Sequence, residues 1–267
     1  MATAAQLRRQ GLEVETVGEI IGGTATGEPQ AVIIDGTKRI YPDLIQGSDE
    51  WLAARQGLLT ASEMKLIITP TTLKAASNDK ERAHLYELLA QRITGYVEPH
   101  FISDDMLRGL DDEWEARRIY VENYGAVEKV GFITNSKFGF TLGYSPDGLV
   151  GSDGLIECKS RRAKYQVQTI LDCVEAQSIP AEFMIQVQTG LMVADDRQWT
   201  DFISYSGGLP MMTVRVYPIP EVQEAIEEAA ASFEARISQK LVEYRELLAS
   251  GARLVPTERK IEQEMFV

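Results

Sequence analysis

Cysteine and histidine are scarce in this chain of 267 residues, which contains two of each. Cys158 and Cys173 do not belong to a C-x-x-C pair, and two thiols cannot complete a four-cysteine zinc or iron–sulfur site. His84 and His100 lie too far apart in the sequence for a histidine-rich metal site. We therefore expect reduced cysteines, as in a cytoplasmic protein, and a chain of this length needs no disulfide to fold.

Long hydrophobic runs are also missing. No segment approaches the roughly 18 uninterrupted apolar residues of a membrane-spanning helix, so we expect no contact with a membrane. The first residues, MATAAQLRRQGLEVE, have no apolar run after their basic pair, and we expect no secretory signal there.

Positive charge is in deficit, with 27 Lys and Arg against 40 Asp and Glu and a net charge of −13. Taken alone, this charge argues against a nucleic-acid partner, because phosphate contacts favour a basic surface. Net charge is an average, however. Carboxylates gathered at a metal site and along solvated helices make the total acidic while a cleft stays basic.

The order of predicted elements indicates an α/β fold. Residues 1–47 read as an N-terminal extension with short strands at 14–21 and 31–42, the second run turning at Asp35-Gly36. From residue 48 to 267 we expect one domain in which helices flank a central mixed β-sheet. The predicted helices span 48–57, 79–95, 104–124, 162–176, 181–194 and 220–250, with a further helix opening at 60–63; the predicted strands span 130–134, 138–144, 148–150, 155–159, 199–205 and 212–217.

The stretch LGYSPDGLVGSDGLIECKS, residues 142–160, carries charges that a buried sheet does not need. In a strand, residues two apart share a face, so Glu157 and Lys159 point together while Ile156 and Cys158 point to the apolar side. Burial of such charges without partners is costly. The pattern therefore predicts either an ion pair at a sheet edge or a metal site.

The metal interpretation rests on oxygen ligands. Asp147 and Glu157 on neighbouring strands can converge on one Mg²⁺, which keeps several waters and which Mn²⁺ can replace. The backbone carbonyl of Cys158 offers a further oxygen. Lys159 is placed to orient an attacking water and to stabilise a charged transition state. P-D followed by E-x-K is the motif of the PD-(D/E)xK nucleases, and it predicts their restriction-endonuclease-like core.

Three further motifs accompany this one. W-x3-R-x-G-(two apolar)-T-A-S-E runs over 51–63, G-x3-E-x2-A-R over 109–117, and Q-V-Q over 186–188. In this order, over 51–217, they resemble the lambda-type phage exonucleases, also called the viral recombinase family. The pattern departs from the family where Ser160-Arg161 follows the lysine in place of Cys-Pro.

The resemblance assigns roles to single residues. Asp147 and Glu157 match the metal-binding carboxylates and Lys159 the catalytic lysine. Glu113 matches the helical glutamate that contributes to the metal site, and Gln186 the active-site glutamine. Arg55 and Ser62 match the residues that bind the phosphate at the end of the substrate. Thr60, close to Ser62, is expected to take part as well.

Helical geometry adds to these assignments. Glu113 and Arg117 stand one turn apart and form an i,i+4 pair, either at the site or on the surface. Gln186 and Gln188 are about 200° apart around their helix, so only Gln186 faces the site. Thr60 to Ser62 are expected at a helix N-terminus, which favours an anion. Arg161, Arg162 and Lys164 are either DNA-backbone contacts or a solvated charge run.

The resemblance implies a Mg²⁺-dependent 5′→3′ exonuclease that degrades one strand of linear double-stranded DNA. We then expect 3′ single-stranded tails for recombination with a single-strand annealing protein, in the cytoplasm of a bacterium or phage-infected host. A homotrimeric ring with a basic inner and an acidic outer surface is expected. The alternatives are a structure-specific endonuclease of the same superfamily, a catalytically inactive DNA-binding subunit and, more remotely, a small-molecule metalloenzyme.

Overall fold

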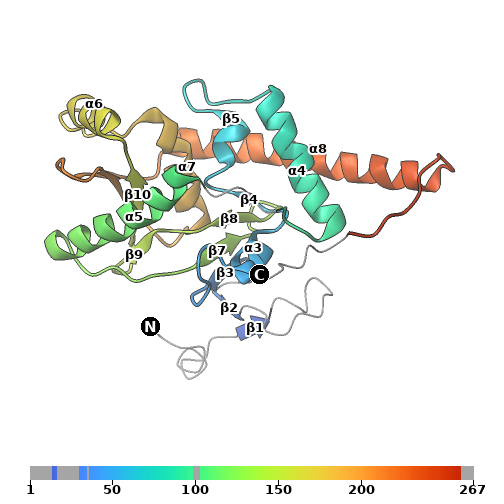
Figure 1. The fold of residues 1–267 in the computed structure, drawn as a ribbon, viewed down its shortest axis with the longest axis horizontal. Helices are drawn as coiled ribbons and strands as arrows, with labels where there is room; N and C mark the ends of the chain where they lie inside the picture. The colour runs from blue at the N-terminus through green and yellow to red at the C-terminus, as the bar shows by residue number, and fades with distance from the viewer. Residues whose placement is uncertain (1–13, 17–29, 35, 99–102, 260–267) are drawn as a thin grey trace, which may run out of the picture.

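The computed structural model describes residues 14–16, 30–34, 36–98 and 103–259 (Figure 1). Its helices are α3 (Asp49–Arg55), α4 (Asp79–Thr94), α5 (Asp104–Asn123), α6 (Ala163–Cys173), α7 (Ala181–Val193) and α8 (Pro220–Ala249), with a 3₁₀ turn η1 (Met64–Leu66). Its strands are β1 (Val14–Thr16), β2 (Gln30–Ile33), β3 (Lys38–Tyr41), β4 (Leu59–Thr60), β5 (Ile68–Thr69), β6 (Lys74–Ala75), β7 (Phe132–Asn135), β8 (Leu142–Tyr144), β9 (Gly148–Val150), β10 (Gly154–Ser160), β11 (Trp199–Tyr205) and β12 (Met212–Val216).

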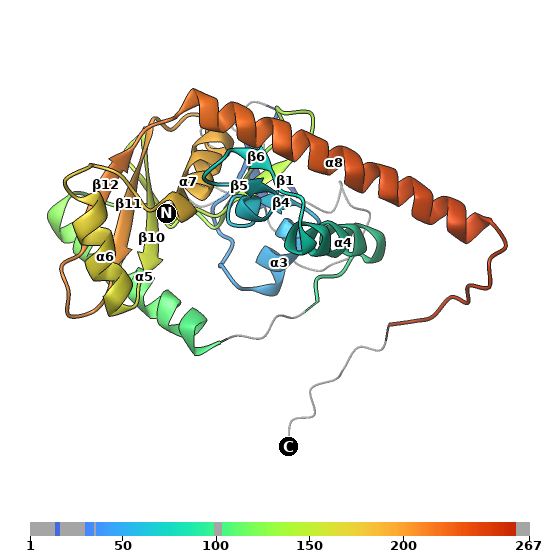
Figure 2. The same cartoon turned by 90° about the horizontal axis from the view of Figure 1, so that it is seen from above.

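The strands are divided between two larger sheets rather than gathered in one. Within the described residues, one sheet has the order β1-β2-β3-β7-β8-β4 and the other the order β12-β11-β10-β9, beside a small β5–β6 hairpin. Both larger sheets are mixed, because β4 runs parallel to β8 and β10 parallel to β11 while their other pairs are antiparallel. Helix α7 packs against strands of both sheets and joins them (Figure 2). The α/β prediction is confirmed.

The first sheet includes the strands expected in the N-terminal segment. β2 and β3 pair antiparallel, as the predicted hairpin requires, and Gly36 adopts a φ of +84° that suits glycine in a turn. Asp35 and residues 17–21 lie outside the described residues. β3 pairs in turn with β7, so the described strands of residues 1–47 belong to the same sheet as later parts of the chain.

The predicted helix start at residues 60–63 is wrong. Leu59 and Thr60 form strand β4 beside β8, and the amide of Ala61 donates to the carbonyl of Gly143 at 2.9 Å. Only the 3₁₀ turn η1 follows, and Glu63 before it makes no side-chain capping bond. Backbone amide and carbonyl groups of residues 59–61 form sheet hydrogen bonds with β8 instead of helical ones. No α-helix therefore begins here whose N-terminus could attract an anion.

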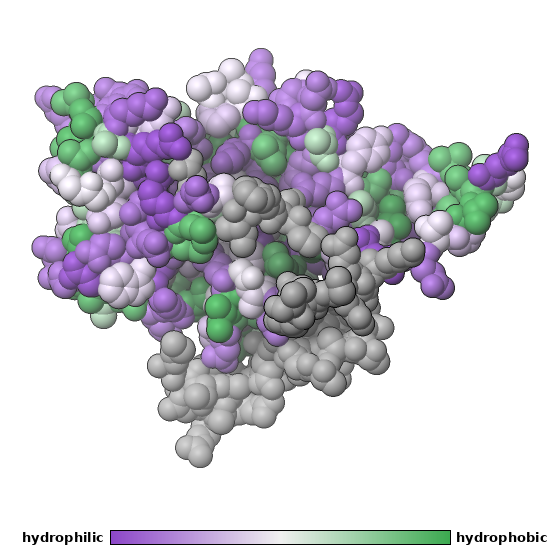
Figure 3. Space-filling view, viewed as in Figure 1, coloured by the Kyte–Doolittle hydropathy of each residue, from purple (hydrophilic) through white to green (hydrophobic). Residues whose placement is uncertain are grey.

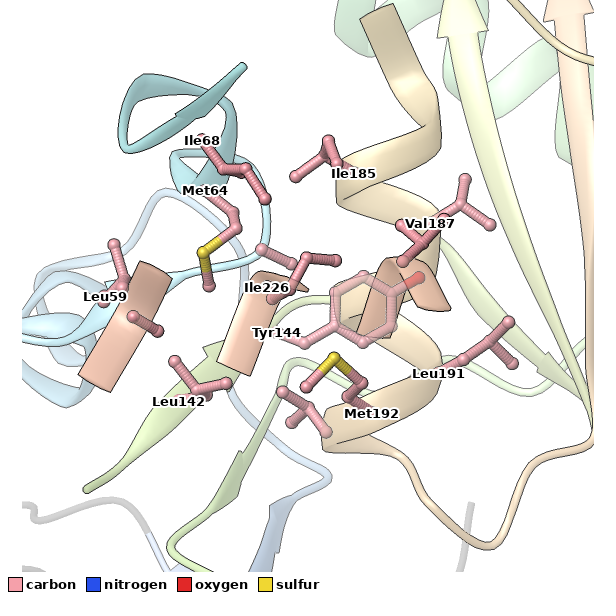
Figure 4. Close-up of a cluster of buried hydrophobic side chains, with 14 of the residues drawn as sticks. Leu59, Met64, Ile68, Leu142, Tyr144, Ile185, Val187, Leu191, Met192 and Ile226 are labelled. Atoms are coloured by element: carbon pink, nitrogen blue, oxygen red, sulfur yellow. The ribbon is translucent and has the colours of Figure 1, made fainter. Parts of the chain in front are cut away.

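A single large cluster of apolar side chains surrounds α7, and Figure 4 shows part of it. Residues 185–193 of α7 are buried throughout, which is why this helix has little polar face. Gly190 lies against the ring of Tyr144, where an added Cβ would come within 2.8 Å of the ring. The glycine thus lets α7 approach β8 closely.

Helix α8 packs on this core along its first half only. The predicted stripe is buried at Val222, Ile226, Phe233 and Ile237, whereas Leu248 is exposed where the helix continues past α4 (Figure 2). Pro220 is the first residue of the helix, as predicted. No helix in the described part of the chain is long and apolar enough to cross a membrane.

Helix α5 forms as predicted, but its apolar stripe faces outward. Leu110 and Trp114 are 58% and 60% exposed, while Ala116 and Tyr120 are buried against β10 and β11. The small Ala116 permits close packing on the sheet, and the hydroxyl of Tyr120 donates to Asp201 at 2.6 Å. The inward face of α5 is therefore the one that carries Glu113 and Arg117.

Candidate active site

Strand β10 separates its side chains as alternation predicts. Ile156 and Cys158 join a small apolar cluster with Ile203 under α5. Glu157, only 1% exposed, points to the other side, where the Lys159 ammonium donates to its Oε1 at 2.7 Å. The ion pair foreseen as one alternative is thus present. It lies where β10 is paired with β11 alone, because the pairing of β10 with β9 ends at Ile156.

Three donors converge on the Glu157 carboxylate. Besides Lys159, the Tyr144 hydroxyl donates to Oε2 at 2.9 Å and the Gln186 amide donates to Oε1 at 2.5 Å. These side chains come from β10, β8 and α7 respectively. Gln186 faces the site as predicted, while Gln188 instead donates to the Tyr217 carbonyl and accepts from the Ile219 amide. Gln188 is therefore a structural residue.

Asp147 lies in the turn between β8 and β9, beside Glu157. Its Oδ2 accepts a hydrogen bond from the backbone amide of Cys158 at 2.5 Å, which aims the carboxylate at β10. Burial raises the pKa of Asp147 well above its usual value, and the neighbouring carboxylates of Glu157 and Glu113 raise it further. The protein thus holds acidic groups together at a site where their charges repel.

Helix α5 brings Glu113 to the same place. The Arg117 guanidinium donates to the Glu113 carboxylate and, through Nε, to the backbone carbonyl of Asp147 at 2.9 Å. Burial raises the pKa of Glu113; Arg117 opposes this effect and Glu157 adds to it. The i,i+4 pair predicted from the sequence is therefore at the site rather than on an outer surface.

This donor set suits a magnesium ion. Mg²⁺ is usually bound by one or two carboxylates together with several waters, and Asp147 and Glu157 are two buried carboxylates whose repulsion a divalent cation would relieve. Among the described residues, no group of three or more His, Cys, Asp or Glu side chains is arranged to hold a metal ion by itself. A third ligand from Glu113 or from the Cys158 carbonyl stays a prediction.

A second group of polar residues is tied to the loop that carries Asp147. The Trp51 indole donates to Ser145 at 2.9 Å, and the Arg55 guanidinium lies over the Trp51 ring at 4.2 Å. Arg55 also donates to Thr60 at 3.2 Å, and the hydroxyls of Thr60 and Ser62 are 3.2 Å apart. The predicted phosphate-binding residues are thus together, positioned by sheet pairing and a tryptophan rather than by a helix end. Glu63 accepts from Thr60 at 2.6 Å and lowers the positive potential of the group.

The basic residues after Lys159 lie between the end of β10 and the first turn of α6. Arg161 is paired with Glu182 at 2.7 Å, and Arg162 stands at the start of α6. Ser160, at the departure from the family pattern, donates to Asp112 at 2.5 Å and so ties β10 to α5.

Sequence reasoning missed Tyr144. Its hydroxyl contacts Glu157, yet in the sequence it is one aromatic residue in a buried strand. Its position three residues before Asp147, within the same quoted stretch, is the signal that was available.

Comparison with known proteins bears on this constellation. The model of the YqaJ-like viral recombinase domain matches residues 50–197, which is more than half of the chain. The chain belongs to this family. The matched segment contains every side chain that converges on Glu157 and Asp147, so the family resemblance predicted from the motifs is confirmed.

Solved structures give the same result for the fold of this YqaJ-like protein. It is 30% identical to the alkaline exonuclease LHK-Exo from Laribacter hongkongensis, with a TM-score of 0.66 over 77% of this chain and all of that one. The structure of LHK-Exo with dAMP matches at 32% identity and a TM-score of 0.67, with the same coverage. A phage-related exonuclease from Haemophilus somnus, at 16% identity and a TM-score of 0.54 over 70% of this chain and 96% of that one, supports the fold alone. No curated protein matches significantly.

Proposed function

We propose that this protein is a Mg²⁺-dependent 5′→3′ exonuclease that degrades one strand of linear duplex DNA and leaves 3′ single-stranded tails. The observation that carries the proposal is the convergence of Lys159, Gln186 and Tyr144 on Glu157, next to Asp147. These groups come from separate elements and form a buried acidic site beside a cationic side chain. Such a site suits phosphodiester hydrolysis with a divalent cation.

The carboxylates and Lys159 have different roles in the proposed reaction. Mg²⁺, when bound by Asp147 and Glu157, supplies positive charge that offsets the charge developing on the phosphate. Burial lowers the pKa of Lys159, but Glu157 and Asp147 outweigh burial and raise it above its usual value. This direction holds for the metal-free protein. In the proposed reaction Lys159 donates hydrogen bonds to the attacking water or the phosphate.

The proposed polarity depends on the group around Arg55. Arg55 with the hydroxyls of Thr60 and Ser62 would hold a terminal 5′-phosphate beside the loop of Asp147. Arginine and hydroxyl donors are suited to phosphate oxygens. A 5′-phosphorylated end would then be placed with its first phosphodiester at the carboxylates.

The proposed role is recombination of the phage type, with a single-strand annealing protein as partner and a homotrimer as the active assembly. Exposed apolar side chains on α5, including Leu110 and Trp114, and on distal α8, including Leu248, supply surface for such contacts. Sedimentation equilibrium tests the assembly, and a monomer at micromolar concentration would contradict it.

Digestion of end-labelled duplex with Mg²⁺ tests the activity and its polarity together. A 5′-phosphorylated end should be degraded faster than a 5′-hydroxyl end, and Arg55→Ala should remove this preference. Asp147→Ala should reduce cleavage by at least a thousandfold, because the loss of one ligand and its charge removes about 4 kcal/mol or more of transition-state stabilisation. Undiminished cleavage by Asp147→Ala would refute the assigned site.

Closed circular DNA separates this proposal from a structure-specific endonuclease. An exonuclease leaves the circle intact and degrades it once linearised, whereas a structure-specific endonuclease nicks a closed circle that carries an extruded cruciform or a bubble. Binding of DNA ends without cleavage, in Mg²⁺ and in Mn²⁺, would instead favour an inactive DNA-binding subunit.

A further inference from the structure

A pocket opens between α6 and the start of α7. Its volume is about 510 Å³, and its walls include Arg161, Tyr165, Asp172 and Glu182. The Phe183 ring is near two cations, with the Lys159 ammonium 5.7 Å and the Arg161 guanidinium 5.1 Å from its centre. Arg161, which lines the pocket, and Lys159 are therefore neighbours of the same aromatic ring.

We propose that this pocket binds one unpaired nucleobase of the DNA that the enzyme processes. The inference rests on the proposed function and adds to it a subsite for a base outside the double helix.

The wall groups favour a flat, uncharged, hydrogen-bonding ligand. The Tyr165 ring is 42% exposed in the first turn of α6, and base–aromatic stacking tolerates any base sequence. Arg161 is neutralised by Glu182, and Asp172 adds a further negative charge, so the pocket itself does not attract a bare phosphate. Carboxylates and a guanidinium match the donor and acceptor atoms on the edge of a base.

Arg161 supplies a more specific observation. Its Nε is buried and has no hydrogen-bond partner among the described residues. One terminal nitrogen donates to Glu182 at 2.7 Å and the other reaches Thr169 at 3.5 Å, a long contact. An unpaired buried donor costs free energy, and an acceptor on a bound base would satisfy it once the guanidinium turns toward the pocket.

The rim of the pocket suits the backbone of the same nucleotide. The Lys164 ammonium lies 4.6 Å from the centre of the Tyr165 ring, at the outer surface of α6. The long lysine side chain is able to swing to a neighbouring phosphate when a base covers the ring. The run Arg161-Arg162-Ala163-Lys164-Tyr165 thus places cations and an aromatic ring directly after the strand that carries Glu157 and Lys159.

The test is a scan of abasic sites, read as binding affinity by fluorescence anisotropy with EDTA present so that the DNA stays intact. The probes are duplexes with a short single-stranded tail, each lacking one base at a different tail or end position. The wild-type protein should show one position at which removal of the base weakens binding about tenfold, which lies within the range for base–aromatic stacking.

Variants connect that position to the pocket. Tyr165→Ala should abolish the loss of affinity caused by removal of that base, which is the penalty measured here, and Tyr165→Phe should retain it. Tyr86→Ala removes an exposed tyrosine from α4 and should leave the penalty unchanged. A penalty that survives in Tyr165→Ala, or the absence of any such position, would overturn the inference. An excess of free deoxynucleoside monophosphate distinguishes the source of the base. Persistence of the tenfold difference shows that the pocket takes only a base of the strand, and its loss shows that a released nucleotide competes for the same pocket.

Cleavage of plain duplex in Mg²⁺ is measured in parallel. If the wild-type protein cleaves duplex DNA but no base removal weakens its binding, the proposed base binding in the pocket is refuted and the proposed function stands. Failure to bind or cleave any DNA would refute both.

Discussion

Glu157 is the residue on which the candidate active site is organised. A carboxylate that is almost fully buried requires partners, and Lys159, Gln186 and Tyr144 provide them from three elements. Asp147 has fewer donors; its burial raises its pKa, and the neighbouring carboxylates of Glu157 and Glu113 raise it further. The site therefore stores electrostatic repulsion at Asp147, as expected where a cation is to bind.

This repulsion predicts that Asp147→Asn stabilises the metal-free protein at neutral pH while it abolishes cleavage. Because the pKa of Asp147 is raised in the folded state, stability falls as pH rises above about 3.8 towards the folded-state pKa, and the loss persists above it. Asparagine does not ionise and still accepts from the Cys158 amide. Denaturant unfolding in EDTA at pH 7 should show a gain of about 1 kcal/mol or more.

Added Mg²⁺ should raise the melting temperature of the wild type and leave that of Asp147→Asn unchanged, because only the former binds the cation in the folded state. The exposed Asp43→Asn serves as control and should behave like the wild type in both conditions. Equal stability of the wild type and Asp147→Asn in EDTA would contradict the proposed repulsion.

Close approach between elements decides whether these residues meet. Helix α7 carries Gln186 to Glu157 because Gly190 allows its backbone to lie on the ring of Tyr144. Helix α5 is held on the second sheet by Tyr120, whose hydroxyl donates to Asp201, and Arg215 pairs with the same carboxylate at 2.8 Å. Through these contacts the α5 backbone presents Glu113 and Arg117 to the loop of Asp147.

Replacement of two helical glycines by alanine should have opposite effects. In a helix interior alanine is favoured over glycine by about 1 kcal/mol, and Gly109→Ala in α5 meets open space, so it should stabilise the protein by up to that amount. Gly190→Ala should destabilise it by about 1–3 kcal/mol, because its Cβ would press on the buried Tyr144 ring. It should also lower cleavage, since Tyr144 is bonded to Glu157. A stabilising Gly190→Ala with full activity would refute this role of the close contact.

Ion pairs between residues that are far apart in the sequence hold the described parts of the molecule together. Lys38 in β3 is buried, and its ammonium lies 2.9 Å from both Asp195 and Asp196 after α7. Lys137 reaches Asp195 as well, at 2.7 Å. Together with the β3–β7 pairing, this ion cluster fixes the strands of the N-terminal segment to the end of the helix that carries Gln186.

Lys38→Met should therefore destabilise the protein at neutral pH by about 1–2 kcal/mol, with the estimate reduced for the partial exposure of both aspartates. Burial lowers the pKa of Lys38, but bonds to Asp196 and Asp195 outweigh it and raise the pKa. Burial likewise raises the pKa of Asp195, and Lys137 and Lys38 outweigh it and lower the pKa.

The contribution of this cluster is consequently complete between about pH 4 and 10. It is lost in acid as Asp195 is protonated, and in alkali as pH passes the raised pKa of Lys38. Urea unfolding across this range measures the difference between the wild type and Lys38→Met. Lys137→Met removes a more exposed partner and should cost less than 1 kcal/mol. A pH-independent difference would contradict the assignment.

Local sequence rules determined the elements and the side of each element that carries chemistry. Alternation placed Glu157 and Lys159 on one face of β10, the 3.6-residue period separated Gln186 from Gln188, and capping by Ser48 began α3 at the predicted place. Tertiary contacts decided the rest. β4 pairing replaced the helix expected at Thr60, and the division of strands into two sheets replaced the single sheet.

The physical reason is range. The alternation of side chains in strands, the period of helices and helix capping depend on residues close together in the sequence. These local patterns therefore predict which face of β10 carries Glu157. Whether Tyr144 reaches Glu157, whether Leu110 and Trp114 face solvent, and whether β3 joins β7 depend on segments that meet only in the folded chain. Those contacts are decided by the competition among all buried surfaces and hydrogen bonds at once.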